Sequence, residues 1–290
     1  MHTEKHTHWH ILGAGAIGTL VAFKLSEQRR VFTLMGRVTH NDSRHFTDLD
    51  NVQQHLIGVE RDAIDYLVIC TKSTQALDAF TSIESRLNPQ SIVICLFNGL
   101  GAQQVIQERA NCPVFFATTT EGVSKIAPGH YAYKGAGETV VDNLILEHIA
   151  EDELPSLFKV VDNIEERLMN KLVVNSLINP LTVLFDCLNG QLLSNAKAMA
   201  LMQVLADEIA LWLSTYLRDT SAGELLKLTA AVAKATANNS SSMRQDIASR
   251  MVSEIDFING YWLSHNPKGL DLKENARLVT EIKKIETGLS

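Results

Sequence analysis

The first half of the chain alternates short apolar runs with amphipathic stretches. The apolar runs that we predict as strands are Trp9–Leu12, Val31–Met35, Tyr66–Cys70, Ile92–Leu96 and Val114–Thr118. Amphipathic segments such as Ile17–Gln28 and Gln75–Arg86 lie between several of them and have helical periodicity. Apolar strands separated by helices are typical of a parallel sheet that is buried on both faces. A second, glycine-containing set of strands, around Gly129–Lys134 and Glu138–Val141, is predicted to be antiparallel.

The pattern changes near Glu166, where glycine becomes rare and helix-forming residues dominate. The segments that we predict as helices are Leu168–Leu184, Ala196–Leu217, Glu224–Ala235, Ser242–Ser264 and Asn275–Glu286. We therefore predict an α/β protein with an N-terminal domain at residues 1–165 and an all-helical C-terminal domain at residues 166–290.

A glycine-rich turn follows the first predicted strand and opens a helix. It consists of Gly13, Ala14, Gly15, Ala16, Ile17 and Gly18. In dinucleotide-binding turns of this pattern, the first glycine permits the tight turn, the second lets a pyrophosphate approach and the third allows close helix–strand packing. Free amides at the helix N-terminus bind the phosphate charge. An ordinary glycine turn is the alternative, but the strand–turn–helix context favours a Rossmann-type domain that binds its cofactor through these residues.

The end of the second predicted strand indicates which dinucleotide is bound. NAD enzymes usually place Asp or Glu there to bind the ribose 2′-hydroxyl. This chain has no acidic residue after Leu34 until Asp42, and it has Arg37 instead. The planar guanidinium of Arg37 could pair with a 2′-phosphate, the alternative being a solvated surface arginine. We therefore predict NADPH/NADP as the cofactor.

Charge and cysteine usage exclude several other classes of protein. The net charge is −7, so there is no global basic surface for nucleic acid. No segment has the roughly 18 consecutive apolar residues of a membrane span. The cysteines are far apart and form no CxxC pair, which argues against a zinc site or disulfides and favours a reducing compartment; they are Cys70, Cys95, Cys112 and Cys187. We therefore predict no metal site. Because the N-terminus is polar and lacks the apolar core of a signal peptide, we predict a cytoplasmic protein.

Several segments, taken in order, resemble the ketopantoate reductase (2-dehydropantoate 2-reductase) family between residue 10 and about residue 265. They are the turn at 13–18, Cys70-Thr71-Lys72, Phe97-Asn98-Gly99-Leu100-Gly101, Lys171 with Asn175 and Asn179-Pro180, Ser241-Ser242-Met243 with Gln245-Asp246, and Glu254-Ile255-Asp256 with Ile258-Asn259-Gly260. The resemblance implies NADPH-dependent reduction of 2-dehydropantoate to (R)-pantoate, a step toward pantothenate and coenzyme A. It implies a small 2-oxo acid as substrate and allows a homodimer.

The resemblance also implies roles for individual residues. Lys171 matches the catalytic lysine of the family, and Glu254 joins it in the predicted catalytic site. Substrate contacts are implied for Asn98, Asn175, Asn179 and Ser242. Lys72 and Asn98 match residues of the family that lie near the nicotinamide and the substrate.

Spacing alone places Lys171, Asn175 and Asn179 on one helix face, because they are four residues apart. One lysine and two amides offer donors for a developing alkoxide and for a carboxylate, as reduction of a 2-oxo acid requires. Lys171 could donate the proton if desolvation lowers its pKa. The alternative is a solvated lysine and two asparagines that cap a helix kinked by Pro180.

Glu254 falls within the apolar stripe of the predicted helix Ser242–Ser264. The stripe consists of Ile247, Met251, Ile255, Ile258 and Trp262. A carboxylate that faces a core needs a partner or a function. It could accept the 4-hydroxyl of ketopantoate or form a structural ion pair. Ser242 also fits a capping box with Gln245.

The chain departs from the family pattern at positions that concern the substrate. Glu121 follows the threonine run, and Lys273 stands where the family has a proline. Two further functions therefore stay open. One is an NADPH-dependent reductase of another 2-oxo acid, and the other is a non-catalytic NADP-binding protein.

Overall fold

The computed structural model describes residues 8–36 and 43–288. Contacts between Cα atoms divide the chain into two compact units. The first runs to Phe97 and includes Ala102–Arg167, and the second contains Asn98–Gly101 and the chain from Leu168 onward. The short segment Asn98–Gly101 therefore belongs to the second unit, although residues of the first unit flank it on both sides.

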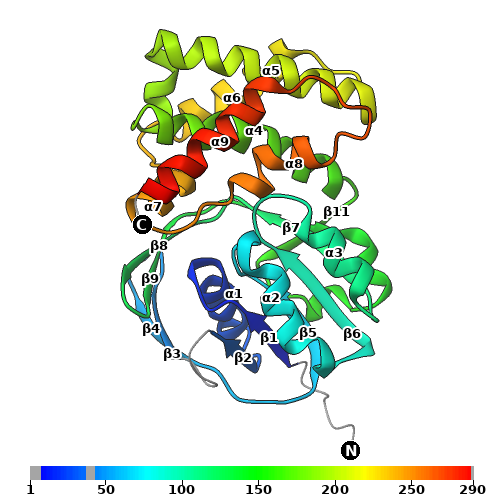
Figure 1. Ribbon diagram of the computed structural model, residues 1–290. Coiled ribbons are helices and arrows are strands. Elements are labelled where there is room, and N and C mark those ends of the chain that lie inside the picture. Colours follow the sequence, from blue (N-terminus) through cyan, green and yellow to red (C-terminus); the bar gives the residue numbers. More distant parts are fainter. Residues whose placement is uncertain (1–7, 37–42, 289–290) are drawn as a thin grey trace, which may run out of the picture. The chain divides into compact units, whose positions relative to one another are not determined.

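The first unit is built on a seven-stranded sheet of order β11-β10-β7-β6-β5-β1-β2 (Figure 1). Strands β2, β1, β5, β6 and β7 run parallel, whereas β10 runs antiparallel to β7. Its strands are β1 (Trp9–Leu12), β2 (Phe32–Met35), β5 (Ile64–Ile69), β6 (Leu87–Leu96), β7 (Val114–Thr119), β10 (Thr139–Asp142) and β11 (Phe158–Val161). The central strands are almost wholly buried, as their apolar runs predicted.

Helices connect the strands of the large sheet. They are α1 (Ala16–Glu27), α2 (Ser73–Ile83) and α3 (Ala102–Arg109), with short 3₁₀ segments η1 (Glu84–Arg86), η2 (Asn143–Glu147) and η3 (Glu151–Glu153). Helices α2 and α3 pack against each other (Figure 1). Parallel strands joined by helices, with a glycine turn after β1, confirm the predicted α/β class with a Rossmann-type first half.

A second, four-stranded sheet of order β4-β3-β9-β8 belongs to the same unit. Its strands are β3 (Ser43–Thr47), β4 (Gln53–Ile57), β8 (Gly122–Ala127) and β9 (His130–Gly135). All four contact α1, where the rings of Phe23 and Phe46 stack with centroids 4.6 Å apart. Because α1 packs against both sheets, it is buried on nearly every side.

The predicted antiparallel set is only partly right. Both segments became antiparallel strands, as predicted: Gly129–Lys134 became β9, which is antiparallel to β8, and Glu138–Val141 became β10, which is antiparallel to β7. They lie in different sheets, however, and do not form one set. Strands β3 and β4 have no counterpart among the predicted elements. Each buries a single apolar side chain, Phe46 or Leu56, so neither has an apolar run.

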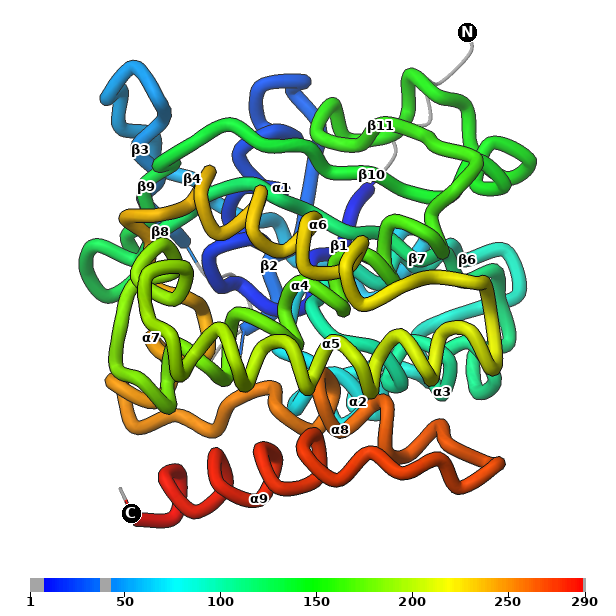
Figure 2. The backbone as a smooth tube through the Cα atoms, turned by 90° about the horizontal axis from the view of Figure 1, so that it is seen from above, coloured from blue at the N-terminus to red at the C-terminus, as the bar shows by residue number. Residues whose placement is uncertain are grey.

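The second unit is helical, and Figure 2 shows α5, α6 and α9 in it. Its helices are α4 (Ile164–Leu184), which begins in the first unit, α5 (Ala196–Tyr216), α6 (Ala222–Ala235), α7 (Ser242–Ala248), α8 (Asn259–Ser264) and α9 (Lys273–Gly288), with 3₁₀ segments η4 (Asn189–Ser194) and η5 (Ile255–Phe257). Among the described residues, α5 is long and apolar enough to cross a membrane by length and composition, a test that core helices of globular proteins also pass.

The single helix predicted over Ser242–Ser264 is wrong. Helix α7 ends at Ala248, and Arg250 adopts a left-handed conformation with φ +55°. The amide of Met251 bonds to the carbonyl of Asp246, and the amide of Arg250 bonds to that of Ile247. These bonds form a Schellman motif, which usually has glycine at the left-handed position. Because arginine occupies it here, the sequence carries no obvious stop signal.

Candidate active site

The glycine turn packs directly against the chain that leaves β5. The amide of Gly13 bonds to the carbonyl of Met35 at the end of β2, at 2.9 Å. Gly13 has φ +106°, and a Cβ there would lie 2.7 Å from the amide nitrogen of Thr71. A Cβ on Gly18 would lie 2.1 Å from the carbonyl oxygen of Gly13. Both positions therefore require glycine, for backbone conformation and for close packing.

Gly15 differs from these two glycines because it borders open space. A Cβ there would meet no atom within 4 Å. Gly15 is the N-cap residue of α1, whose first turn contains no acidic side chain. The first amides of a helix have no partners within the helix and attract anions. The turn therefore fits the pyrophosphate of a dinucleotide, with Gly15 where the ligand approaches the backbone.

Two further predicted cofactor residues have different outcomes. Lys72 is half-buried and is the N-cap residue of α2, directly after Thr71. Lys72 therefore lies in the loop between β5 and α2, next to Thr71, whose backbone packs against Gly13. Arg37 lies outside the described residues.

Arg44 also contacts the glycine turn, although sequence reasoning missed it. It lies on β3, and its Nε donates to the carbonyl of Ala14 at 3.1 Å. Tyr131 of β9 donates its hydroxyl to the same carbonyl at 3.4 Å. Only the pairing of the second sheet brings these residues to the turn, so no local pattern could have indicated them.

Helix α4 carries Lys171, Asn175 and Asn179, and it continues through Pro180. Their four-residue spacing places the three side chains on one face. Lys171 and Asn175 are partly buried, and Asn179 is buried. The structure therefore excludes a fully solvated lysine at position 171.

Lys171 and Glu254 are electrostatically coupled within the second unit. Burial lowers the pKa of Lys171 to about 8, and the nearby carboxylate of Glu254 raises it in part. Glu254 is only 6% exposed. An ammonium group with a pKa near neutrality can both hold and release a proton at physiological pH.

The burial of Glu254 has a different cause from the one predicted. Glu254 lies in no helical stripe; it is the N-cap residue of η5, beyond the end of α7. Met251, a member of the predicted stripe, is 42% exposed. Glu254 is buried because the chain after Arg250 turns back into the unit, where Ser253 and Ile255 are buried beside it.

The segment Asn98–Gly101 brings a third predicted site residue into this unit. The amide of Leu100 donates to the carbonyl of Phe257 at 2.9 Å. Gly99 has φ +76°, and a Cβ there would lie 2.6 Å from the Cβ of Phe257. Asn98 is thus held next to the 3₁₀ turn that Glu254 begins, and the glycine at 99 permits this close approach.

Ser242 does not cap α7, so that part of the prediction is wrong. The N-cap residue is Ser241, whose hydroxyl accepts from the amide of Arg244 at 3.0 Å. The Ser241 hydroxyl also lies 2.6 Å from Oγ1 of Thr182 in α4. This tertiary contact selects Ser241 over its neighbour, and Ser242 is exposed in the first turn.

A buried polar network supports α4 at Pro180. Proline has no amide hydrogen, so the carbonyl of Ser176 loses its usual helical donor. Nδ2 of Asn259 donates to that carbonyl at 3.1 Å and to Oδ1 of Asn275 at 3.0 Å. Asn275 in turn donates to Glu208 of α5 at 2.8 Å. Asn259 therefore substitutes for the missing amide, and this lets the helix continue past the proline.

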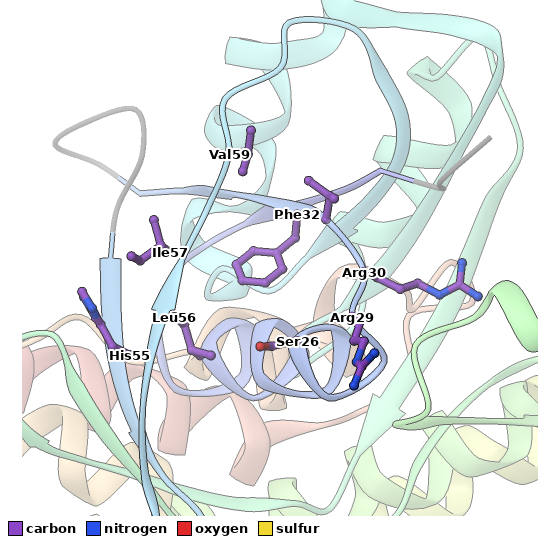
Figure 3. Close-up of a pocket in the computed structure, with 9 residues that line it drawn as sticks. Ser26, Arg29, Arg30, Phe32, His55, Leu56, Ile57 and Val59 are labelled. Carbon is purple, nitrogen blue, oxygen red and sulfur yellow. The ribbon is translucent and has the colours of Figure 1, made fainter. Parts of the chain in front are cut away.

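A surface pocket of about 380 Å³ lies elsewhere in the first unit (Figure 3). Its wall includes Ser26 and Arg29 at the carboxyl end of α1 and Phe32 at the start of β2. The glycine turn lies at the other end of that helix, and the pocket lining includes none of the predicted site residues that the structure describes. No cluster of metal-binding side chains occurs within residues 8–36 and 43–288.

Together these features define a Rossmann-type protein, with a glycine turn that fits a dinucleotide phosphate in one unit and a partly buried lysine next to a buried glutamate in a helical second unit. Two family models match the chain: Ketopantoate reductase PanE/ApbA over residues 9–144, and its C-terminal counterpart over residues 163–286. The chain belongs to the ketopantoate reductase family and is an oxidoreductase of the 2-dehydropantoate 2-reductase type.

Individual relatives agree with this membership. The 2-dehydropantoate 2-reductase of Vibrio cholerae is 30% identical and aligns over 97% of this chain and 98% of its own. D-Mandelate dehydrogenase, in a structure with NADH and anilino(oxo)acetate, has TM-score 0.84 at 21% identity and covers 98% of this chain and 99% of its own. A dimeric ketopantoate reductase from Staphylococcus aureus also has TM-score 0.84, at 18% identity, and covers 98% of this chain and 100% of its own. The two structures share the fold.

Proposed function

We propose that the chain catalyses the NADPH-dependent reduction of 2-dehydropantoate to (R)-pantoate, in the route to pantothenate and coenzyme A. The observation that carries the proposal is the partly buried Lys171, with a pKa of about 8, coupled to the buried Glu254 and on one helix face with Asn175 and Asn179. This set combines a proton donor with amide donors and a carboxylate. The proton donor and the amide donors can interact with the ketone and carboxylate of a 2-oxo acid, and the carboxylate of Glu254 can accept a hydrogen bond from a hydroxyl on the same substrate.

Lys171 is the general acid in this proposal. Reduction of a ketone adds a hydride to carbon and a proton to oxygen; bound NADPH supplies the hydride. Lys171 donates its Nζ proton to the C2 oxygen as negative charge develops there, and solvent then reprotonates it. Asn175, Asn179, Asn98 and Ser242 supply polar contacts to the substrate, including its carboxylate.

Glu254 orients the substrate in this proposal. Its carboxylate accepts a hydrogen bond from the 4-hydroxyl, a group that simpler 2-oxo acids lack. An analogue without this hydroxyl leaves a buried carboxylate without that partner, which disfavours its binding. Glu254 therefore supplies specificity for a hydroxylated 2-oxo acid.

For the cofactor, the proposal uses Gly13, Ala14, Gly15, Ala16, Ile17 and Gly18, with Lys72 and Asn98 toward the nicotinamide. The preference for NADPH rests on the absence of an acidic residue at the end of β2 and on Arg37. We also propose a homodimer, as in the Staphylococcus aureus relative. A second candidate function is reduction of another 2-oxo acid. It is favoured by the match to D-mandelate dehydrogenase and by Glu121 after the threonine run.

An NADPH-oxidation assay with ketopantoate and a panel of 2-oxo acids tests the proposal. We expect ketopantoate to have the highest kcat/KM in the panel. Glu254→Ala should raise KM for ketopantoate, and it should do much less harm with an analogue that lacks the 4-hydroxyl.

Three results would contradict this proposal. A higher kcat/KM with another 2-oxo acid would favour the second candidate function. An equal loss with both substrates in Glu254→Ala would show that Glu254 does not recognise the hydroxyl. If no 2-oxo acid in the panel raised the rate of NADPH oxidation above the rate measured without substrate, a non-catalytic NADP-binding protein would be favoured.

A further inference from the structure

Arg44 is a positively charged residue that the fold of the second sheet brings to the glycine turn. On β3, Arg44 and Phe46 share one face, and Phe46 is fully buried against α1. This face directs the side chain of Arg44 toward the start of the helix. There its Nε donates to the carbonyl of Ala14 at 3.1 Å, and its Nη1 donates to the carbonyl of Ser43 at 2.9 Å.

These contacts place the guanidinium beside Ala14 of the glycine turn. The amide of Gly13 is bonded to Met35, the last residue of β2, and Ala14 is the next residue. In Rossmann-type domains, the group that binds the 2′ position of the adenosine ribose lies at the end of this strand. The end of β2 and Arg44 thus bond to consecutive residues of the turn, Gly13 and Ala14, so the guanidinium lies near the strand end where such a ribose is bound.

The two hydrogen bonds also fix the orientation of the guanidinium. In each of these two bonds the acceptor is a backbone carbonyl, whose position does not depend on a side-chain rotamer. A planar, permanently charged fork that is held in place is well suited to a phosphate. A lysine at this position could retain the charge but not this geometry.

We propose that Arg44 is a specificity-determining residue that binds the 2′-phosphate of NADPH. The inference rests on the proposed use of a nicotinamide dinucleotide and adds the residue that distinguishes its phosphorylated form. It is independent of the predicted role of Arg37, and it assigns to β3 a function besides covering α1.

Binding measurements with NADPH and NADH test this assignment. Calorimetric titration of Arg44→Gln should show a Kd for NADPH raised about ten- to a hundredfold and a Kd for NADH changed less than about threefold. Arg44→Lys should lose less NADPH affinity than Arg44→Gln. Adenosine 2′,5′-bisphosphate and 5′-AMP, which lack the nicotinamide, should show the same contrast as NADPH and NADH.

Arg29→Gln is the matched control, because it removes the same charge from an exposed site at the other end of α1. It should leave both dissociation constants unchanged. Equal losses for NADPH and NADH in Arg44→Gln would overturn the proposal, since they would indicate support of the turn or contact with the pyrophosphate. Unchanged affinity for NADPH would also overturn it.

The unmodified protein separates this inference from the proposed function. Tight binding of NADPH without reduction of ketopantoate would contradict the proposed substrate and leave the role of Arg44 intact. Equal affinity for NADPH and NADH would overturn the assignment of Arg44 but not the reductase. Binding of neither dinucleotide would overturn both.

Discussion

Lys171 shows how its surroundings change the chemistry of one side chain. An exposed lysine is almost fully protonated at neutral pH and a poor proton donor. Burial removes water from the ammonium and lowers the pKa of Lys171 to about 8, while the negative charge of Glu254 opposes this effect. The two residues therefore set the acidity of the proposed proton donor together.

The pH dependence of reduction follows from this pKa. Since the protonated lysine is the active form, kcat/KM should be high below pH 8 and fall as the pH rises through about 8. Glu254→Gln removes the charge that raises the pKa of Lys171, so the fall should begin at lower pH. Lys171→Ala should lower kcat by about a hundredfold or more.

Rate profiles between about pH 6 and pH 10 measure the effect. Glu281→Gln is the control, because Glu281 lies on α9 in the same unit and pairs with Arg277 at the surface. Its profile should match that of the unmodified protein. A fall at the same pH in Glu254→Gln would show that Glu254 does not influence the proton donor.

At the level of elements, the end of α7 determines where Glu254 lies. The left-handed Arg250 reverses the chain, and the next four residues lead to Glu254. Arg250 is exposed, so its contribution comes from its backbone conformation rather than from side-chain packing. A non-glycine residue in this conformation costs about 1–2 kcal/mol, and a β-branched residue is especially unfavourable there.

Substitutions at Arg250 should therefore follow backbone conformation. We expect Arg250→Val to lower the free energy of unfolding by about 1–2 kcal/mol, while Arg250→Gly changes it by less than about 1 kcal/mol. Urea unfolding followed by tryptophan fluorescence measures this difference, because Trp212 and Trp262 are both in the second unit. Equal stability of the two variants would show that strain at residue 250 does not matter.

At the level of the whole molecule, the two units should respond differently to acid. His8 and His10 are buried in the first unit, and the His8 ring lies 2.8 Å from Oγ1 of Thr33. Burial, with smaller contributions from His10 and Arg61, lowers the pKa of His8 to about 4, and burial also lowers that of His10. Both rings are therefore neutral in the folded protein near pH 7.

Acid should selectively destabilise the first unit. Between about pH 6.5 and pH 4 the unfolded chain binds a proton at residue 8 that the folded chain does not, so stability is full above this range and falls within it. At pH 5 the loss from His8 is about 2 kcal/mol. Hydrogen-exchange protection factors, corrected for intrinsic rates, should fall in β1 and β2 more than in α5 and α6.

The variant His8→Gln provides the control for this effect. Glutamine can still bond to Thr33 but cannot gain a charge, so most of the acid sensitivity of β1 and β2 should disappear. If acid lowered protection equally in both units, or if His8→Gln behaved like the unmodified protein, the buried histidine would not be the cause.

The sequence by itself determined the features that depend on neighbours along the chain. Continuous apolar runs predicted β1, β2, β5, β6 and β7, because strands buried on both faces need no polar alternation. The glycines at 13 and 18 indicated their turn because their spacing reflects close packing within a few residues. The face of α4 followed from helical geometry, which is fixed by the backbone.

The tertiary structure decided what depends on partners far apart in the chain. The second sheet places Arg44 at Ala14, although β3 has one buried apolar side chain and no strand-like run. Asn98 joins the second unit through Phe257, and Asn259 compensates for Pro180. Glu254 is buried in a turn that begins after a left-handed arginine, not in the helix that periodicity predicted. Apolar periodicity records which positions are buried, but not which distant backbone or side chain buries them, so these contacts exist only once the chain has folded.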